Sequence, residues 1–262
     1  MNKQEQIKYI EKEYNLESGM HSKRLVRQNF FSKIETELQA YLLGFFASDG
    51  SIDEKRKTFR IHLSRKDEEL VLLYKNIISP DCRTFIIKEH STIGRNGKAI
   101  KAGESIGIDI NSSRICNDLV NLGFGYKKTY SNLHIPKIDE NLIRHFIRGY
   151  FDGDGTITGC YSKPDLKWHK KERVRLVASI CSKTRTILDD ISIFLKLNDI
   201  KSSICFGKRD EMWILSVPKS QLKKLFNLLY KDSYFYLNRK YLKFNYYVNT
   251  EESRLIADLR NA

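Results

Sequence analysis

The sequence lacks the marks of a zinc-binding, secreted or membrane-spanning protein. Its five cysteines are far apart and include no Cys-x-x-Cys pair, and its six histidines show no zinc-ligand spacing with them. No apolar run reaches transmembrane length, and the first residues contain no signal-peptide core. We therefore expect a water-soluble, intracellular chain with free thiols and no membrane partner.

Acidic residues are also scarce relative to basic ones. The 262 residues include 46 Lys and Arg against 32 Asp and Glu, which gives a formal net charge of +14. The cations are spread along the chain rather than gathered in a tail, so they indicate a folded basic surface. Such a surface binds nucleic acid or an anionic membrane. The length allows a substantial core in one large or two small domains.

One apolar stretch occurs twice. Residues 42–50 read LLGFFASDG and residues 147–155 read IRGYFDGDG. Both indicate buried helices, the first beginning at the capping-box pattern of residues 32–35 and the second at Asp139. A glycine inside a helix costs about 1 kcal/mol. Because Gly44 and Gly149 repeat that cost in register, we expect the two helices to cross closely there.

An aspartate ends each repeat. Asp49 and Asp154 precede Gly50 and Gly155, which we expect to stop the helices as C′ glycines. A carboxylate at a helix C-terminus is unfavourable by about 0.3–1 kcal/mol, and crossing helices would bring the two carboxylates together. Two like charges at one site need a cation or a shared proton. We therefore predict a divalent metal site with one aspartate from each copy.

Two alternative interpretations of the repeat are weaker. Asp-Gly is a common turn signal, so a plain helix-to-strand turn is the alternative for either copy alone, although its repetition in register argues against it. A calcium-binding loop aligned on Gly155 would place its first and last ligands on Tyr150 and Tyr161, which cannot serve.

Patterning elsewhere predicts the order αββαββα in each half. Alternation in residues 59–63 buries Phe59, Ile61 and Leu63 on one face of a strand, and residues 173–181 alternate similarly. We predict an α+β fold of two pseudo-symmetric halves, each with an antiparallel four-stranded sheet, that together form a basic DNA-binding saddle. The expected divisions are a basic N-terminal extension (1–31), a first half (32–138), and a second half with a C-terminal tail (139–262). The extension is either an arm on the DNA backbone or a leader that covers the first helix.

The two motifs resemble the nine-residue signature of the LAGLIDADG homing endonucleases. Length and repeat spacing resemble the single-chain, double-motif form, and the resemblance covers about residues 30–250. It implies a monomeric, Mg²⁺-dependent enzyme, with Mn²⁺ able to substitute, that cuts both strands of double-stranded DNA at a specific site. It also implies cleavage across the minor groove with a short 3′ overhang, and mobility of its own gene or host intron.

The resemblance also implies roles for single residues. Asp49 and Asp154 would bind the metal and act in catalysis, and Lys128 and Lys240 match a lysine that relatives carry in the connector after each half. Asp152 needs no catalytic role, because Ala47 holds its position in the first copy. Ser64 and Ser182 match a water-positioning group. The predicted DNA-binding residues are Arg60, His62, Arg95, Lys98, Lys127, Lys170, Lys171, Arg173, Arg175 and Arg239.

Other functions fit the same fold. A non-cleaving intron maturase that binds RNA, or a DNA-binding regulator, would keep the scaffold without needing the two aspartates. A nicking enzyme, which cuts one strand only, is a variant of the endonuclease itself. Both Asp49 and Asp154 are present, which favours the endonuclease. We expect it in the cytoplasm beside the nucleoid, in an organelle, or as a phage-encoded protein.

Overall fold

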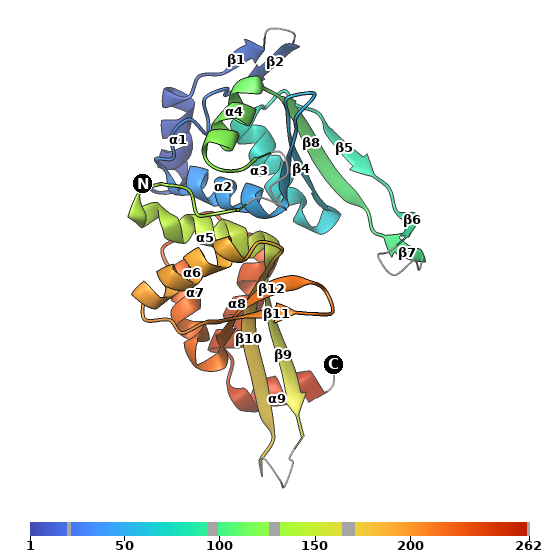
Figure 1. Ribbon diagram of the computed structural model, residues 1–262, viewed down its shortest axis with the longest axis vertical. Helices are drawn as coiled ribbons and strands as arrows, with labels where there is room; N and C mark the ends of the chain where they lie inside the picture. Colours follow the sequence, from blue (N-terminus) through green and yellow to red (C-terminus); the bar gives the residue numbers. More distant parts are fainter. Residues whose placement is uncertain (20–21, 94–98, 126–131, 164–170, 261–262) are drawn as a thin grey trace.

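Two helices cross in the middle of the molecule, between two four-stranded antiparallel sheets. The computed structural model describes residues 1–19, 22–93, 99–125, 132–163 and 171–260. Helices α2 (Glu37–Asp49) and α5 (Glu140–Asp154) lie side by side, with one sheet beyond each of them (Figure 1). This arrangement confirms the predicted α+β fold of two halves built around the repeated motif.

The first half follows the predicted order with one addition. Its sheet has the strand order β3-β4-β8-β5. A separate two-stranded hairpin of β6 (His90–Ile93) and β7 (Ala99–Ala102) lies between β5 and β8 in the chain and is absent from the predicted order. The remaining elements, in chain order, are β3 (Gly50–Asp53), β4 (Thr58–Ser64), a 3₁₀ turn (Arg65–Asp67), α3 (Glu68–Ile78), β5 (Thr84–Ile87), β8 (Ser105–Asn111) and α4 (Ser113–Asn121).

The second half repeats the pattern and then adds two helices. Its sheet has the order β11-β12-β10-β9, so the two hairpins of each half pair in the same way. Helices α8 (Asn238–Asn249) and α9 (Glu252–Arg260) follow, where the predicted order has only a C-terminal tail. The other elements are β9 (Gly155–Ser162), β10 (Arg173–Ser182), α6 (Arg185–Leu197), β11 (Ser203–Gly207), β12 (Met212–Pro218), a 3₁₀ turn (Lys219–Gln221) and α7 (Leu222–Tyr230).

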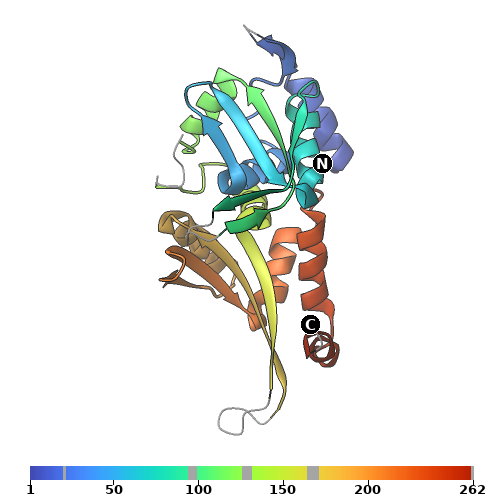
Figure 2. The ribbon, with the colours of Figure 1, turned by 90° about the vertical axis from the view of Figure 1, so that its right-hand side faces the viewer.

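The alternation predicted for the strands is present. In β10, Val174, Leu176 and Ala178 are buried under the helices, whereas Arg173 and Arg175 are exposed on the other face. The hairpin of β9 and β10 is the longest projection of the second half, and α9 lies against it (Figures 1 and 2). Each sheet therefore has one face against the core and one face open, as a saddle requires.

The sequence predicted the start of α5 correctly and the start of α2 incorrectly. The N-cap of α2 is Thr36, whose capping box is completed by Gln39, so the expected start at residues 32–35 was wrong. The Gln39 side chain also donates to backbone carbonyls of the preceding loop, which fixes this register. Asp139 caps α5 as predicted and accepts a hydrogen bond from the Asn141 N–H at 2.8 Å.

The N-terminal residues pack on the first half. Helix α1 (Lys3–Glu13) is followed by a hairpin of β1 (Glu17–Gly19) and β2 (Ser22–Val26). The buried side chain of Gln6 accepts from the N–H of Leu38, in the first turn of α2, at 3.0 Å. The segment thus covers the start of the first helix, and its role as an arm on the DNA backbone stays a prediction.

All five cysteines are free thiols, as expected. No helix in the described part of the chain combines the length and the apolar character needed to cross a membrane.

Candidate active site at the ends of the crossing helices

The two central helices touch backbone to backbone at their glycines. A Cβ placed on Gly44 would lie 1.9 Å from the carbonyl oxygen of Phe146, and one on Gly149 would lie 2.0 Å from that of Tyr41. Real Cβ atoms do not approach other atoms this closely, so only glycine fits at either position. The predicted close crossing is confirmed.

Gly50 and Gly155 end the helices in a different way from the one expected. Both have extended backbone, with φ −73° and −80°, and they begin the strands β3 and β9 directly. The left-handed C′ conformation was therefore the wrong reason for these glycines. A Cβ on Gly50 would lie 2.1 Å from the ring of Phe46, and one on Gly155 would lie 2.4 Å from the ring of Phe151.

Asp49 and Asp154 are the last residues of α2 and α5, and both are exposed. A Cβ on Gly153, next to Asp154, would lie 2.4 Å from the Asp49 Oδ2 atom, which shows how near the two helix ends are. Burial raises the pKa of Tyr150, and the negative charges of Asp154 and Asp49 both add to that rise. Both carboxylates therefore lie near Tyr150, and the two helix ends lie together as predicted.

The donor set suits a hydrated magnesium ion. Within the described residues, no group of three or more His, Cys, Asp or Glu side chains could hold a metal ion. Mg²⁺ commonly binds through one or two carboxylates and takes its other ligands from water and substrate phosphates. Asp49 and Asp154 carry hard oxygen atoms of that kind and would leave the remaining positions to water and substrate.

Lys240 reaches the same place from α8. Its Nζ donates to the backbone carbonyls of Phe151, Gly153 and Gly155 at 3.1, 2.7 and 2.5 Å. Burial is the main cause that lowers the pKa of Lys240 to about 8; the charge of Arg239 lowers it further, and nearby aspartates oppose the shift. The structure thus brings this predicted residue to the end of α5, where it caps the helix. Lys128, its predicted counterpart, lies outside the described residues.

Asp152 is buried and serves the structure of the site. Its carboxylate accepts hydrogen bonds from the hydroxyls of Tyr41 and Tyr230 at 2.9 and 2.6 Å, and from the N–H of Leu237 at 2.7 Å. Burial raises its pKa, and these three hydrogen bonds act against the rise. The location agrees with the expectation that Asp152 need not take part in the chemistry.

Arg148 is a residue that the sequence reasoning missed. It is fully buried, and its Nη2 pairs with Oε1 of Glu37 at 2.8 Å across the helix interface. It also donates to the carbonyls of Phe235 and Leu229 at 2.7 and 2.9 Å. The signal was an arginine in an apolar helical run, which requires an acidic partner when buried.

The two serines do not occupy equivalent positions. The equivalent glycines Gly50 and Gly155 pair with Ile61 and Ile180, so these two isoleucines are equivalent as well. Ser182 comes two residues after Ile180, and its counterpart is therefore Leu63, two residues after Ile61. Ser182 is buried and accepts a hydrogen bond from the Tyr150 hydroxyl at 3.3 Å, whereas Ser64 is exposed. A shared water-positioning role for the pair does not fit this register.

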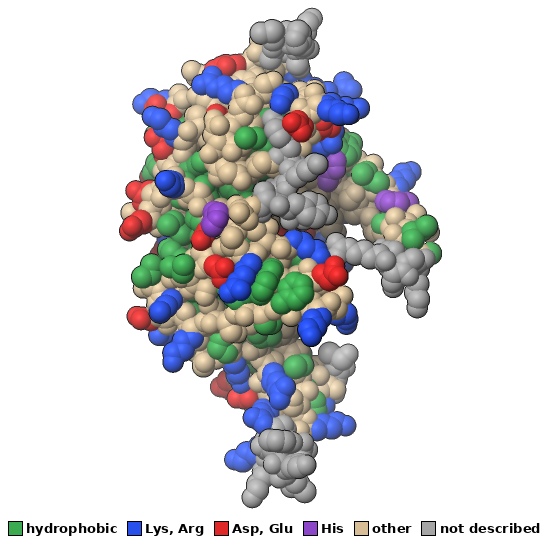
Figure 3. All heavy atoms as spheres, in the orientation of Figure 1, with side chains coloured by type: hydrophobic (Ala, Val, Ile, Leu, Met, Phe, Trp, Pro, Cys, Tyr) green, Lys and Arg blue, Asp and Glu red, His purple; other side chains and the backbone are tan. Residues whose placement is uncertain are grey.

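The predicted DNA-binding residues divide into three groups: residues paired with an acidic side chain, residues exposed at the β9–β10 hairpin, and residues outside the described part of the chain. On the first sheet, Arg60 pairs with Asp53 at 3.0 Å, and His62 lies 2.8 Å from Asp109. Arg239 is paired with Asp67 of the first half. Lys171, Arg173 and Arg175 are exposed at the β9–β10 hairpin, around which lysine and arginine side chains gather in Figure 3. Arg95, Lys98, Lys127 and Lys170 lie outside the described residues.

Comparison with known proteins agrees with this fold. Residues 36–78, which run from the cap of α2 to the end of α3, match the family described as LAGLIDADG-like domain. No curated protein sequence matches the chain.

Among solved structures, the fold is similar to the meganuclease I-SmaMI and to the LAGLIDADG homing endonuclease I-LtrWI. A double mutant of I-SmaMI has a TM-score of 0.55 and 14% identity over 85% of this chain and 97% of that one. I-SmaMI bound to uncleavable DNA has a TM-score of 0.53 and 13% identity, covering 86% and 98%. I-LtrWI bound to target DNA has a TM-score of 0.51 and 13% identity, covering 86% and 97%.

Proposed function

We propose that this chain, which carries a LAGLIDADG-like domain and the fold of the single-chain LAGLIDADG homing endonucleases, is itself a site-specific DNA endonuclease. It would hydrolyse one phosphodiester bond in each strand as a monomer, use Mg²⁺ with Mn²⁺ as a substitute, and leave a short 3′ overhang. The observation that carries the proposal is the meeting of Asp49 and Asp154 at the ends of the crossing helices, between the two sheets. Mobility of its own gene or host intron, and its cellular location, stay predictions.

The chemistry needs groups that the two helix ends can provide. Bound Mg²⁺ supplies charge stabilisation for phosphodiester hydrolysis and activates the attacking water. Asp49 and Asp154 would hold the metal, and each aspartate would serve one DNA strand, in keeping with the pseudo-symmetry of the halves. Lys240 fixes the backbone around Asp154 through its three hydrogen bonds. We propose Lys128 for the corresponding role in the first half.

The open sheet faces would hold the duplex. The net charge of +14 favours association with a polyanion, and Arg173 and Arg175 lie on the open face of β10. The hairpins β6–β7 and β9–β10 project from the two sheets (Figures 1 and 2) and lengthen the surface that can follow a groove. I-SmaMI and I-LtrWI, which share the fold, have been solved with DNA bound. These features support binding to double-stranded DNA.

The test is a selection for cleaved duplexes from a random or host-genome library with Mg²⁺. The proposal expects one recurring cut site with a staggered double-strand break in the wild-type protein. Asp49→Asn and Asp154→Asn should both lose that double-strand break, because each removes a metal-binding carboxylate. Asp258→Asn, which changes an exposed carboxylate on α9, is the matched control and should cut normally. Salt-sensitive binding by the wild type without any cutting would overturn the enzyme and leave a DNA-binding regulator.

A further inference from the structure

The first turn of α8 is fixed by carboxylates from both halves of the molecule. The N–H of Leu237 donates to Asp152 at 2.7 Å, and the N–H of Asn238 donates to Glu69 of α3 at 3.0 Å. The guanidinium of Arg239 pairs with Asp67, with 2.7 Å between Nη2 and Oδ2. The first N–H groups of a helix have no partners within it and form its positive end, so carboxylates stabilise it there.

Asp152 is the most constrained of these three acids. It is 1% exposed, and besides Leu237 it accepts hydrogen bonds from Tyr41 of α2 and Tyr230 of α7. A carboxylate with three donors placed around it has little freedom to shift. The start of α8 is therefore tied to both central helices through one side chain.

Lys240 follows three residues after Leu237 and points back at α5. An ammonium has three protons, and here each has a backbone carbonyl as its partner, at Phe151, Gly153 and Gly155. These carbonyls lie on both sides of Asp154. The contacts form a closed loop, in which Asp152 anchors the start of α8 and α8 returns Lys240 to the residues around Asp154.

The first half cannot form this loop in the same way. Ala47 stands where the second half has Asp152, so no carboxylate is present at that position of α2. Among the described contacts of α2, the Tyr74 hydroxyl donates to the Leu42 carbonyl at 2.5 Å. The carboxylate that supports the end of α5 therefore has no counterpart on α2.

We propose that Asp152 is a positioning residue for one of the two cleavage sites. It holds the start of α8 so that Lys240 fixes the backbone around Asp154, whereas the matching position at the Asp49 site is Ala47, which offers no carboxylate. The strand specificity of this role rests on the proposed endonuclease function, but the placement of Lys240 does not.

The placement is tested without any cleavage assay. The full-length wild-type and Asp152→Asn proteins are treated with an amine-acylating reagent, and modification of each lysine is followed by mass spectrometry. Lys243, exposed on the same helix, is the internal reference, and Asp258→Asn is the matched control variant. The proposal expects modification of Lys240 relative to Lys243 to rise severalfold in Asp152→Asn and to stay unchanged in Asp258→Asn.

Equal modification of Lys240 in folded Asp152→Asn and wild-type protein overturns the proposal. If Asp152→Asn does not fold, Tyr230→Phe decides the same point, because it removes one hydrogen bond to Asp152 and keeps the ring. Lys240 should then be modified faster than in the wild type, and an unchanged rate overturns the proposal.

The strand specificity is tested with a cleavable duplex labelled on each strand separately. Asp152→Asn should slow cutting of one strand by about tenfold or more, as is usual when a supporting partner of a catalytic group is removed. The affected strand should be the one that Asp154→Asn fails to cut, and the dissociation constant for DNA should not change. Equal slowing of both strands contradicts the assignment to one site. If the wild-type protein does not cut at all, the endonuclease proposal fails, while the acylation result still decides the placement of Lys240.

Discussion

The backbone of Gly44 lies against the backbone of Phe146. A Cβ added to Gly44 would lie 1.9 Å from the Phe146 carbonyl oxygen, so there is no room for one. Gly149 stands in the same relation to Tyr41. Since Asp49 and Asp154 each follow their glycine by five residues (44 to 49 and 149 to 154), the crossing point determines where the carboxylates meet. The glycines therefore set the geometry of the site as well as the packing of the helices.

Replacement of either crossing glycine by alanine should be severely destabilising. A methyl group on residue 44 or 149 would collide with backbone atoms, which cannot rotate away, so the helices must separate. We expect Gly149→Ala to lower the free energy of unfolding by about 3 kcal/mol or more, at the upper end of the usual overpacking cost. Urea denaturation measures the change. Gly125→Ala is the control, because nothing lies within 4 Å of a Cβ there, and it should be neutral or slightly stabilising.

The buried pair of Arg148 and Glu37 should behave non-additively. Changing one partner leaves the other charge buried and unpaired, so Glu37→Leu and Arg148→Leu should each cost about 3–5 kcal/mol of unfolding free energy. The double variant carries leucine at both positions, as the other half does: Leu142 is the counterpart of Glu37, and Leu43 is the counterpart of Arg148. It should lose clearly less than the sum of the two single changes in a double-mutant cycle by urea denaturation. Simple additivity would show that the pair is not coupled.

Stability should fall in mild acid because of His145. Burial, together with the charges of Arg148 and Arg144, lowers the pKa of His145 to about 2. An unfolded histidine has a pKa of about 6.5, so below that pH only the unfolded state takes up the proton and the free energy of unfolding decreases. The slope from this one group reaches about 1.4 kcal/mol per pH unit as pH falls below about 6.

Denaturant unfolding at several pH values between about 7 and 5, above the range in which most carboxylates titrate, measures that slope. His145→Gln retains an acceptor for the Arg148 Nη1–H, which donates to His145 Nδ1 at 2.7 Å. It should therefore flatten the dependence. An equal slope in the variant would assign the acid sensitivity to other groups.

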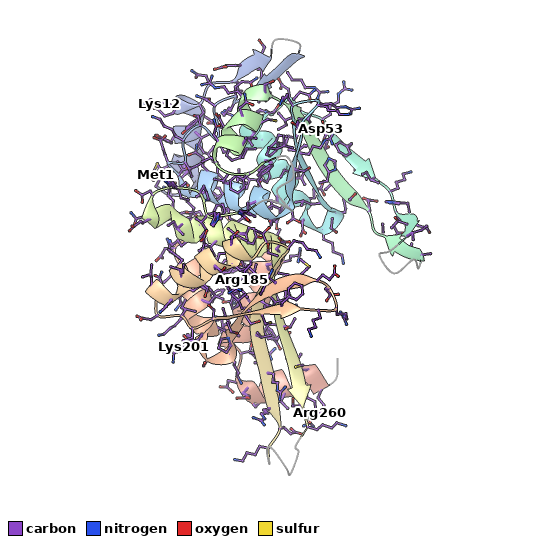
Figure 4. The ribbon with its side chains drawn as sticks, in the orientation of Figure 1. Met1, Lys12, Asp53, Arg185, Lys201 and Arg260 are labelled. Carbon is purple, nitrogen blue, oxygen red and sulfur yellow. The ribbon has the colours of Figure 1, made fainter. Side chains whose placement is uncertain are left out.

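Arg175 should contribute to DNA affinity through the phosphate backbone. If it contacts one phosphate, Arg175→Ala should weaken binding to all sequences alike and reduce the slope of log K against log salt by about 0.9. Fluorescence anisotropy over a range of salt concentrations gives the slope. Lys12→Ala is the control, because Lys12 lies on α1, far from the β9–β10 hairpin (Figure 4). A change in affinity for only one sequence would instead indicate a base contact.

The sequence by itself determined the repeated architecture and the pair of aspartates. Period-two alternation in β4 and β10 reflects burial of one face of each strand, and the apolar runs of α2 and α5 reflect burial on all sides. Each residue type indicates whether its own position is buried, so these elements can be read from the sequence. The motif register linked Gly44 to Gly149 and Asp49 to Asp154 before any contact was known. The division of the chain at residues 31/32 and 138/139 stays a prediction.

The tertiary structure alone decided how the site is supported. Lys240 reaches the carbonyls around Asp154 only because α8 starts at a point fixed by Asp67, Glu69 and Asp152, which lie 85 or more residues away in the chain. The strand register, which separates Ser64 from Ser182, likewise depends on pairing between segments. Local patterns report which face of an element is buried. They do not report which distant polar group completes a buried hydrogen bond, because that choice is made only when the helices and sheets pack together.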